Sequence, residues 1–254
     1  MKDFTHEFYE KYLDAIKRKF INIIRFDEYF LFNPYPSSFC IIRHDVDRKT
    51  RNALEMAKIE KEMGILTIAI VTKPFYFEGE RRAKVAEEGI VKLKNHVDTL
   101  ITLCNDRLLQ VSTKSTSLTE AFLLADDILR QGVQGISDII NVPGLVNVDF
   151  ADIKTIIKDA GSAWMGIGTA RGENRAVEAA QKAISSPLLE GVSIRGAKNL
   201  LVNVTGSKNL TMQEIDAGNN IIFDAAGEEA NVIFGMVNKE EMEDAVSYTV
   251  IATG

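Results

Sequence analysis

The distribution of glycine constrains this chain more than any other feature of its sequence. All 17 glycines lie at or after Gly64, so the first 63 residues contain none. Glycine adopts left-handed backbone conformations without strain and lets a backbone approach a ligand closely. The first quarter of the chain therefore lacks the usual means of building a tight phosphate-binding turn.

Other properties change at the same place. Residues 1–63 hold 11 of the 20 aromatic side chains, and their 12 basic and 11 acidic residues nearly balance. The remainder has 18 basic and 25 acidic residues. Two sources of sequence would produce such a change, and so would an aromatic-rich helical cap on one continuous domain. Composition alone leaves both interpretations open.

The overall composition excludes several classes of protein. The chain has 254 residues, of which 46% are hydrophobic and 26% charged, and this is typical of a globular protein. Its net charge of -6 offers no general attraction to nucleic acid or to an anionic membrane. No apolar run approaches the roughly 18 to 20 residues of a membrane span, and Cys40 and Cys104 make no disulfide framework. We expect a cytoplasmic protein without membrane insertion or a nucleic-acid partner.

Hydrophobic periodicity predicts an α/β fold. The predicted helices cover residues 4–24, 51–63, 79–96, 117–141, 150–160, 173–183 and 211–223, and the predicted strands cover 38–43, 65–71, 99–103, 163–169, 199–205, 232–237 and 245–252. The first strand, helix and strand after residue 37 form a unit typical of a parallel sheet with right-handed crossovers. The long helix at 117–141 opens with a predicted capping box of Ser117 and Glu120.

Several stretches after residue 62 carry a specific family resemblance. They read G-I-L-T-I-A-I-V-T-K-P-F-Y-F-E-G at 64–79, V-Q-G-I-S-D-I-I at 133–140, P-G-L-V-N-V-D-F-A-D at 143–152 and M-G-I-G-T-A-R-G-E-N-R-A at 165–176. The match continues to the closing T-V-I-A-T-G. Over about residues 62–254 the chain resembles FtsZ, the bacterial relative of tubulin.

The resemblance implies a fold and a set of partners. It implies a truncated tubulin/FtsZ-like GTPase domain with a parallel sheet at 64–116, a long central helix at 117–141, and a C-terminal α+β two-layer sandwich domain at 142–254. Residues 1–63 stand apart as an N-terminal segment. The family binds GTP or GDP with Mg and forms head-to-tail filaments of FtsZ subunits, so the division ring at mid-cell is the implied location.

Three residues match the loop that completes the hydrolytic site of the neighbouring subunit in such a filament. They are Asn147, Asp149 and Asp152. Carboxylates suit this role because they accept hydrogen bonds from an attacking water near a phosphoryl group. A structural role is also open for Asp149 and Asp152, since acids at the start of a helix cap its free amides and favour its dipole.

The resemblance also places nucleoside contacts in this sequence. Glu78 and Arg82 match the ribose side, and Asn105, Phe122 and Asp126 match the guanine contacts. Because Phe122 and Asp126 are four residues apart, one helix face offers a ring for stacking and a carboxylate for the N–H groups of the base. The alternative is that Phe122 belongs to the core and that Glu78 and Arg82 form an ordinary surface pair.

The phosphate-binding part of the family pattern is missing. Where FtsZ-like proteins have a glycine-rich loop, this chain reads R-H-D-V-D-R-K-T-R at 43–51. The open amides that bind a phosphate are absent there, and Asp45 and Asp47 would repel the anion. We therefore expect weak GTP binding.

Residues 39–64 look instead like the start of a NodB-type polysaccharide deacetylase. In that family the first acid, here Asp45, is the general base, and the second, here Asp47, binds a divalent metal together with two histidines from a later motif. The chain has only His6, His44 and His96, and no pair has the required spacing. We predict no metal site, and a polar loop that caps the following helix is the simpler interpretation.

These observations predict an FtsZ-like cell-division protein, a GTP-dependent filament-forming GTPase that is impaired in its own GTP binding. The alternatives are a non-enzymatic interaction or capping module of FtsZ filaments and a remnant of a metal-dependent polysaccharide deacetylase. The join near residue 63 gives the sequence a chimeric character.

Overall fold

The computed structural model describes residues 22–25, 39–42, 50–109, 116–141, 146, 148–189 and 194–254. The α-helices are α2 (Thr50–Glu62), α3 (Glu80–Lys94), α4 (Asn105–Leu108), α5 (Leu118–Asn141), α6 (Phe150–Ile157), α7 (Arg175–Ile184) and α8 (Met212–Ala226). The strands are β1 (Asn22–Arg25), β2 (Phe39–Ile42), β3 (Ile68–Lys73), β4 (Thr99–Cys104), β5 (Gly161–Arg171), β6 (Asn199–Gly206), β7 (Asn231–Asn238) and β8 (Ala245–Thr253). Short 3₁₀ turns are η1 (Tyr76–Glu78), η2 (Pro187–Leu189) and η3 (Glu240–Met242).

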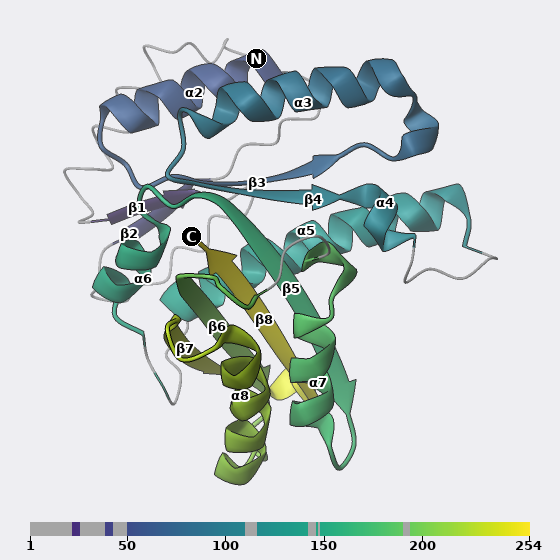
Figure 1. The fold of residues 1–254 in the computed structure, drawn as a ribbon, viewed down its shortest axis with the longest axis vertical. Coiled ribbons are helices and arrows are strands. Elements are labelled where there is room, and N and C mark those ends of the chain that lie inside the picture. The colour runs from purple at the N-terminus through teal and green to yellow at the C-terminus, as the bar shows by residue number, and fades with distance from the viewer. Residues whose placement is uncertain are drawn as a thin grey trace.

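One six-stranded sheet runs through most of the described chain, in the order β3-β4-β5-β8-β6-β7 (Figure 1). Strands β3, β4 and β5 are parallel, as predicted for the first part of the sheet. Strand β8 is antiparallel to both of its neighbours, β5 and β6. The long strand β5 therefore joins β3 and β4 to the C-terminal lobe, which comprises α7, α8, β6, β7 and β8, without a break in the sheet.

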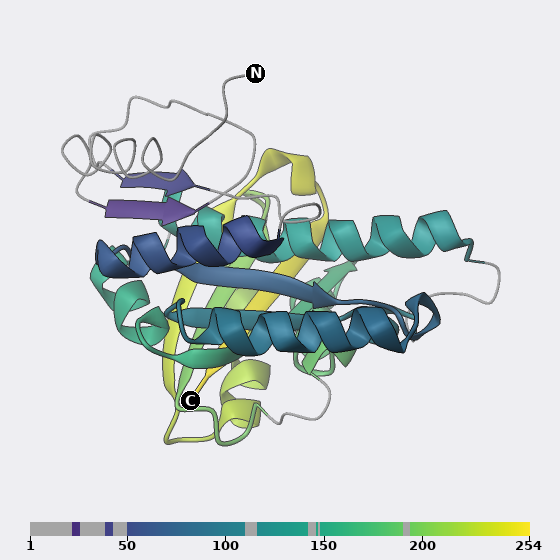
Figure 2. The same ribbon diagram turned by 90° about the horizontal axis from the view of Figure 1, so that it is seen from above.

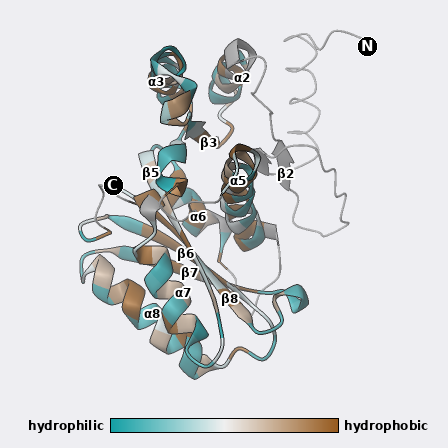
Figure 3. Cartoon of the chain, turned by 90° about the vertical axis from the view of Figure 1, so that its right-hand side faces the viewer, coloured by the Kyte–Doolittle hydropathy of each residue, from teal (hydrophilic) through white to brown (hydrophobic). Residues whose placement is uncertain are grey.

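Helices cover both faces of this sheet (Figures 2 and 3). One face packs against α2 and α3 at β3 and β4, and against α7 and α8 at the C-terminal strands. The opposite face packs against α5 and α6, whose isoleucines meet apolar side chains of β4, β5, β6 and β8. The C-terminal lobe thus has the predicted layers of sheet and helices, and the central helix forms a further layer behind it.

The structure corrects the predictions for the N-terminal elements. Phe39–Ile42 is a strand, as predicted, but it pairs in parallel with β1 and not with β3, so the expected unit is divided between two sheets. The helix predicted for 4–24 is wrong at its end, because Asn22–Arg25 is strand β1. The rest of that helix lies outside the described residues. Side-chain periodicity did not reveal that a strand begins at residue 22.

Strand β3 also begins three residues later than predicted. Gly64 has a positive φ of 67°, which turns the chain after α2. The Thr67 backbone N–H then donates to Asp98 Oδ2 at 2.7 Å and not to a neighbouring strand. The apolar residues of this turn are consequently core contacts that precede the ladder, and pairing with β4 starts at Ile68.

Helix α2 shows how the end of residues 1–63 contacts the rest of the molecule. Ala57 is fully buried against the β4 side chain of Leu100 and against Val97. Glu60 is fully buried as well, with Oε2 3.5 Å from Thr67 Oγ1. The Lys61 ammonium donates to the Asn95 carbonyl at the end of α3. This part of the N-terminal segment therefore packs into the sheet domain.

The central helix α5 has the predicted capping box. The Ser117 N–H donates to Glu120 Oε2 at 2.6 Å, and the Glu120 N–H donates to Ser117 Oγ at 3.3 Å. These bonds to Ser117 lower the pKa of Glu120. Twenty-four residues give a helix of about 36 Å, long enough to run from one end of the sheet to the other. Within the described ranges, no helix is both long and apolar enough to cross a membrane.

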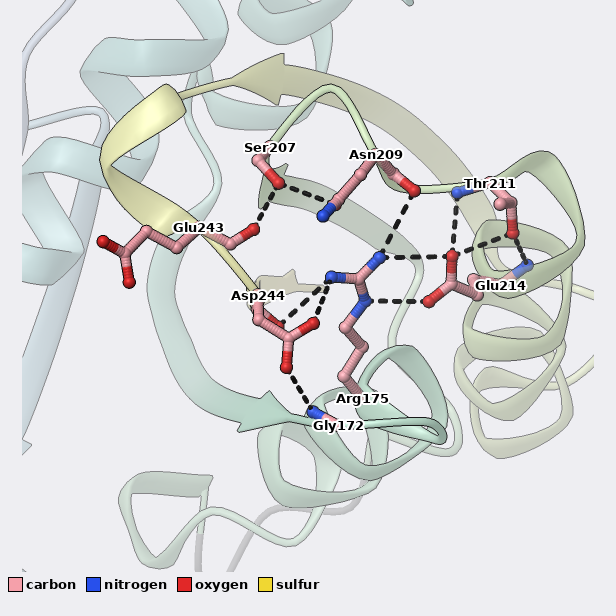
Figure 4. A network of polar contacts seen from close by, with 8 residues as sticks. All are labelled: Gly172, Arg175, Ser207, Asn209, Thr211, Glu214, Glu243 and Asp244. Atoms are coloured by element: carbon pink, nitrogen blue, oxygen red, sulfur yellow. Dashed lines mark hydrogen bonds and ion pairs between the residues drawn. The ribbon is translucent and has the colours of Figure 1, made fainter.

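A polar network closes the far end of the C-terminal lobe (Figure 4). Arg175 is buried and donates from Nε to Glu214 at 2.8 Å and from Nη1 to Asp244 at 2.9 Å. Hydrogen bonding to Arg175 lowers the pKa of Glu214 to about 2. Glu214 also caps α8 through Thr211. One guanidinium therefore connects the starts of α7, α8 and β8.

Candidate functional site

The carboxyl ends of β3 and β4 lie side by side and carry the predicted nucleoside residues. The two strands end together, with Lys73 paired to Cys104. The turn η1 follows β3, and α4 begins with Asn105 directly after β4. In open parallel sheets, ligands bind at this edge because successive loops converge there. The N-terminal half of α5 passes the same edge and adds Phe122 and Asp126.

Glu78 is held by the turn that it closes. Its Oε1 accepts from the Phe75 backbone N–H at 2.9 Å, and its Oε2 accepts from Arg82 Nη1 at 2.5 Å. The Glu78 side chain is 11% exposed, whereas that of Arg82 is 72% exposed. Glu78 is thus both a structural residue of η1 and a fixed acceptor at the predicted ribose position. A carboxylate has further lone pairs, so these bonds do not exhaust it.

An aromatic cluster connects η1 to the central helix. Phe75 is 1% exposed and stacks on Phe77 at a centroid distance of 4.9 Å. Phe122 meets both rings edge to face, at 5.4 Å from Phe75 and 6.2 Å from Phe77. Phe122 remains 39% exposed. Phe122 is therefore not a core residue. Part of its ring contacts Phe75 and Phe77, and the exposed part is available for stacking.

Asn105 supplies an acceptor with no partner. The residue is 5% exposed, and its Oδ1 is buried without a hydrogen bond. An unpaired buried carbonyl is costly, and a ligand N–H that donates to it would recover that cost. Asp126 is exposed on α5, one turn after Phe122. An amide oxygen and a carboxylate accept hydrogen bonds from N–H groups, and an aromatic ring stacks on a flat base.

The predicted hydrolytic residues lie at the other end of the sheet. Asp149 is the N-cap of α6, and its Oδ1 accepts from the Ala151 N–H at 3.1 Å. Asp152 is exposed in the first turn of the same helix. Helix α6 leads into β5, whose Gly161 pairs with Thr99 at the start of β4. The Ile157 carbonyl at the end of α6 accepts from Thr99 Oγ1 at 2.5 Å.

Two groups of predicted residues are therefore separated by the length of β4 (Figures 1 and 2). Glu78, Arg82 and Asn105 lie at its carboxyl end, and Asp149 and Asp152 lie beyond its amino end. The structural role predicted for Asp149 as a helix cap is present. One molecule does not bring the acids to its own nucleoside residues, so a shared site needs two molecules.

Some of the predicted residues lie outside the part of the chain that the structure describes. Asn147 is one of them, as are His44, Asp45 and Asp47 of the deacetylase-like motif. In the part of the chain that the structure describes, no three His, Cys, Asp or Glu side chains gather in a way that would hold a metal ion.

Sequence reasoning missed the residues that support the site. Phe75 and Phe77 fix Phe122, and Asp106 Oδ1 accepts from the Tyr76 N–H at 2.9 Å. The signal for the first two was available, because the aromatic run P-F-Y-F follows directly on a buried strand. The position of Asp106 at the start of a four-residue helix gave no such signal.

Two protein-family models match parts of this chain. Residues 52–113 match the GTPase domain of the Tubulin/FtsZ family, and residues 161–254 match the C-terminal domain of the FtsZ family. The chain carries tubulin/FtsZ-family domains. The FtsZ-like GTPase match begins at residue 52, inside helix α2.

Solved structures agree with this assignment. An FtsZ from M. jannaschii, in a structure described as an empty dimer, is 38% identical over 81% of this chain, with a TM-score of 0.76. CetZ1 from Haloferax volcanii, described as a GDP-bound monomer, is 20% identical over 79% of this chain, with a TM-score of 0.62. The matched region is 59% of the CetZ1 chain. The CetZ likeness concerns the fold alone. The match covers 59% of the M. jannaschii FtsZ chain, so this chain spans somewhat more than half of that protein.

Proposed function

We propose that this chain is an FtsZ-like cell-division protein that joins FtsZ filaments at one end and is impaired in its own GTP binding. The observation that carries the proposal is the placement of the two residue groups at opposite ends of β4. A head-to-tail assembly brings the acidic end of one subunit to the nucleotide end of the next. The chain has a well-packed acidic end, and its nucleotide end is incomplete.

The nucleoside half of the GTP site is the part that this chain retains. We assign the ribose side to Glu78 and Arg82 and the base to Asn105, Phe122 and Asp126. The exposed face of Phe122 stacks the guanine ring, and Asp126 accepts from its N–H groups. The phosphates and their Mg lack a glycine-rich loop, because no glycine precedes Gly64. Weak binding of GTP and GDP follows.

The acidic end is the part that acts on a partner. Asn147, Asp149 and Asp152 face the nucleotide of an intact FtsZ subunit, where the carboxylates accept hydrogen bonds from the attacking water. Asp149 performs this role from the N-cap position of α6, where its own side chain caps the helix. The chain offers the next subunit no competent nucleotide face. It therefore caps a filament instead of extending it.

We also propose the domain organisation that the sequence indicates. Residues 1–63 are the N-terminal segment, deacetylase-like before the GTPase-family match begins at residue 52, 64–116 are the remnant of the GTPase domain, 117–141 are the central helix, and 142–254 are the C-terminal domain. The packing of α2 on the sheet supports a folded join and not a loose fusion. Action on FtsZ filaments would bring the chain to the division ring.

The test is to add the chain, at a small fraction of the FtsZ concentration, to polymerising M. jannaschii FtsZ. Light scattering follows polymer mass, and phosphate release follows GTP turnover. Capping predicts a fall in polymer mass that is large compared with the amount of chain added. The double variant Asp149→Ala/Asp152→Ala should still lower polymer mass but leave the terminal nucleotide unhydrolysed. Unchanged polymer mass and turnover would contradict the proposal.

A further inference from the structure

The segment that carries the acidic residues is docked on the outer edge of the C-terminal sheet. Strand β7 is the last strand of that sheet. The Met236 N–H on its free side donates to the Val146 carbonyl at 3.2 Å, which makes an antiparallel bridge. Two residues later, Val148 packs on Gly235. Asp149, the helix cap, comes next in the chain.

Gly235 is the residue that makes room for this contact. A Cβ built at Gly235 would lie 3.0 Å from Val148 Cγ2 and 3.6 Å from Ile139 Cγ2 of α5. The backbone there is ordinary strand, without the positive φ that favours glycine for conformational reasons. Glycine is even unfavourable inside a strand, since it packs nothing and loses more entropy. The close approach of Val148 is therefore the physical reason for glycine at this position.

A buried ion pair holds the same strand to the central helix. Directly after β7, Lys239 Nζ lies 2.6 Å from Asp138 Oδ2 of α5, and the side chain of Asp138 is 5% exposed. Gln134 Nε2 donates to the other carboxylate oxygen at 2.6 Å. The Lys239 backbone N–H also donates to the Gly206 carbonyl of β6. The edge of β7 is thereby fixed in relation to both the helix before the acidic segment and the sheet.

The other side of the segment is fixed by α6. Its Ile153, Ile156 and Ile157 are each 1% exposed in the core between helix and sheet. The acidic cap is thus held between a buried helix behind it and the edge of β7 in front. Small shifts of a catalytic group are expensive in rate, and two fixed supports limit such shifts.

We infer that β7 is the positioning element of the acidic segment, and that Gly235 and Lys239 are positioning residues for the carboxylates of Asp149 and Asp152. The inference rests on the proposed function for its catalytic meaning, but its structural part stands alone. The space beside Gly235 that Val148 occupies determines where α6 begins. A side chain at position 235 would fill this space and would move Asp149 and Asp152 without removing them.

The first experiment uses the chain alone and measures hydrogen–deuterium exchange by mass spectrometry. Gly235→Val should speed exchange of the 148–153 amides by about tenfold while α7 and α8 keep their protection. The double variant Gly235→Ala/Val148→Ala relieves the clash and should return exchange to within about threefold of the original chain. Gly89→Val is the matched control, because a Cβ at Gly89 meets nothing within 4 Å. Unchanged exchange at 148–153 in Gly235→Val would overturn the inference.

The second experiment adds the catalytic readout. An intact FtsZ whose own acidic-loop carboxylates are replaced by alanine supplies the bound GTP, so turnover depends on this chain. Gly235→Val should lower the stimulated kcat by about tenfold while the Kd between the two proteins stays within about threefold. Lys239→Arg should keep stimulation that Lys239→Met loses. A weaker Kd together with a lower kcat, or no change in either, would contradict a positioning role for Gly235. If the original chain gives no stimulation, the proposed function is wrong, and the exchange result alone decides the inference.

Discussion

The C-terminal lobe and the remnant of the GTPase domain differ in how completely their strands are supported. In the lobe, β8 and β6 each pair on both sides, and the buried alanines of α7 pack against β5 and β8. In the remnant, β3 pairs only with β4 among the described strands, and α3 has no buried residue. The sheet of the lobe is therefore supported along both sides, whereas the remnant is supported by α2, by the buried face of β4 and by the aromatic cluster beside η1. The proposed function divides in the same way, since the acidic residues that act on a partner lie beside the well-supported C-terminal sheet.

The largest expected effect is the loss of the aromatic anchor in the remnant. Phe75→Ala removes a ring that is 1% exposed and should lower the free energy of unfolding by about 3 to 5 kcal/mol. Phe77→Ala is the control, because Phe77 is 52% exposed and should cost about 1 kcal/mol or less. Urea unfolding followed by circular dichroism measures both. Equal losses would show that the remnant does not depend on Phe75.

A slightly smaller effect is expected from the polar network of the lobe. Arg175→Ala leaves Glu214 and Asp244 without their shared cation and should cost about 3 kcal/mol. Arg175→Lys keeps the charge but loses the two-pronged geometry, so it should cost less. Differential scanning calorimetry gives the two values. If alanine and lysine gave equal losses, charge pairing would not be what holds the network together.

The same network predicts how stability depends on pH. The pKa of Glu214 falls from 4.5 in the unfolded chain to about 2 in the fold. Its contribution is therefore fully present above pH 4.5 and is lost as the pH falls toward 2, and we expect about 1 to 2 kcal/mol after allowance for solvent screening. Glu214→Gln should remove this part of the acid dependence in a pH series of urea unfolding curves. A variant with the same pH slope as the original chain would refute the assignment.

The smallest effect concerns the start of the central helix. Ser117→Ala removes the oxygen that accepts from the Glu120 N–H and should cost about 1 kcal/mol or less. Ser117→Asn keeps an acceptor there and serves as the control. Thermal unfolding of the two variants, compared with the original chain, is the measurement. A loss as large as that of Phe75→Ala would mean that α5 depends on its cap more than on its packing.

What the sequence predicted well has a local cause. The capping box of Ser117 and Glu120 depends on only four consecutive residues. The helices and strands of the C-terminal lobe follow from the spacing of apolar residues within each segment. The family motifs added the fold class, which the strand order and the similarity to FtsZ confirm. The roles given to the site residues remain predictions, although the structure shows Asp149 as a helix cap.

What the sequence did not predict depends on distant partners. Strand β2 was recognised, but its pairing with β1 was not, because a short apolar strand carries no mark of its neighbour. The ion pair of Lys239 with Asp138 joins residues about a hundred positions apart, and neither position is unusual by itself. The space for Val148 beside Gly235 is likewise visible only when the two segments are placed together.

The most direct test of the account is isothermal titration of the chain with guanosine and with GTP in the presence of Mg. We predict weak binding of both, with affinities that agree within about threefold, because the proposed contacts are to the nucleoside and no glycine-rich loop holds the phosphates. Micromolar affinity for GTP, far tighter than for guanosine, would contradict it and would indicate a complete FtsZ-type nucleotide site.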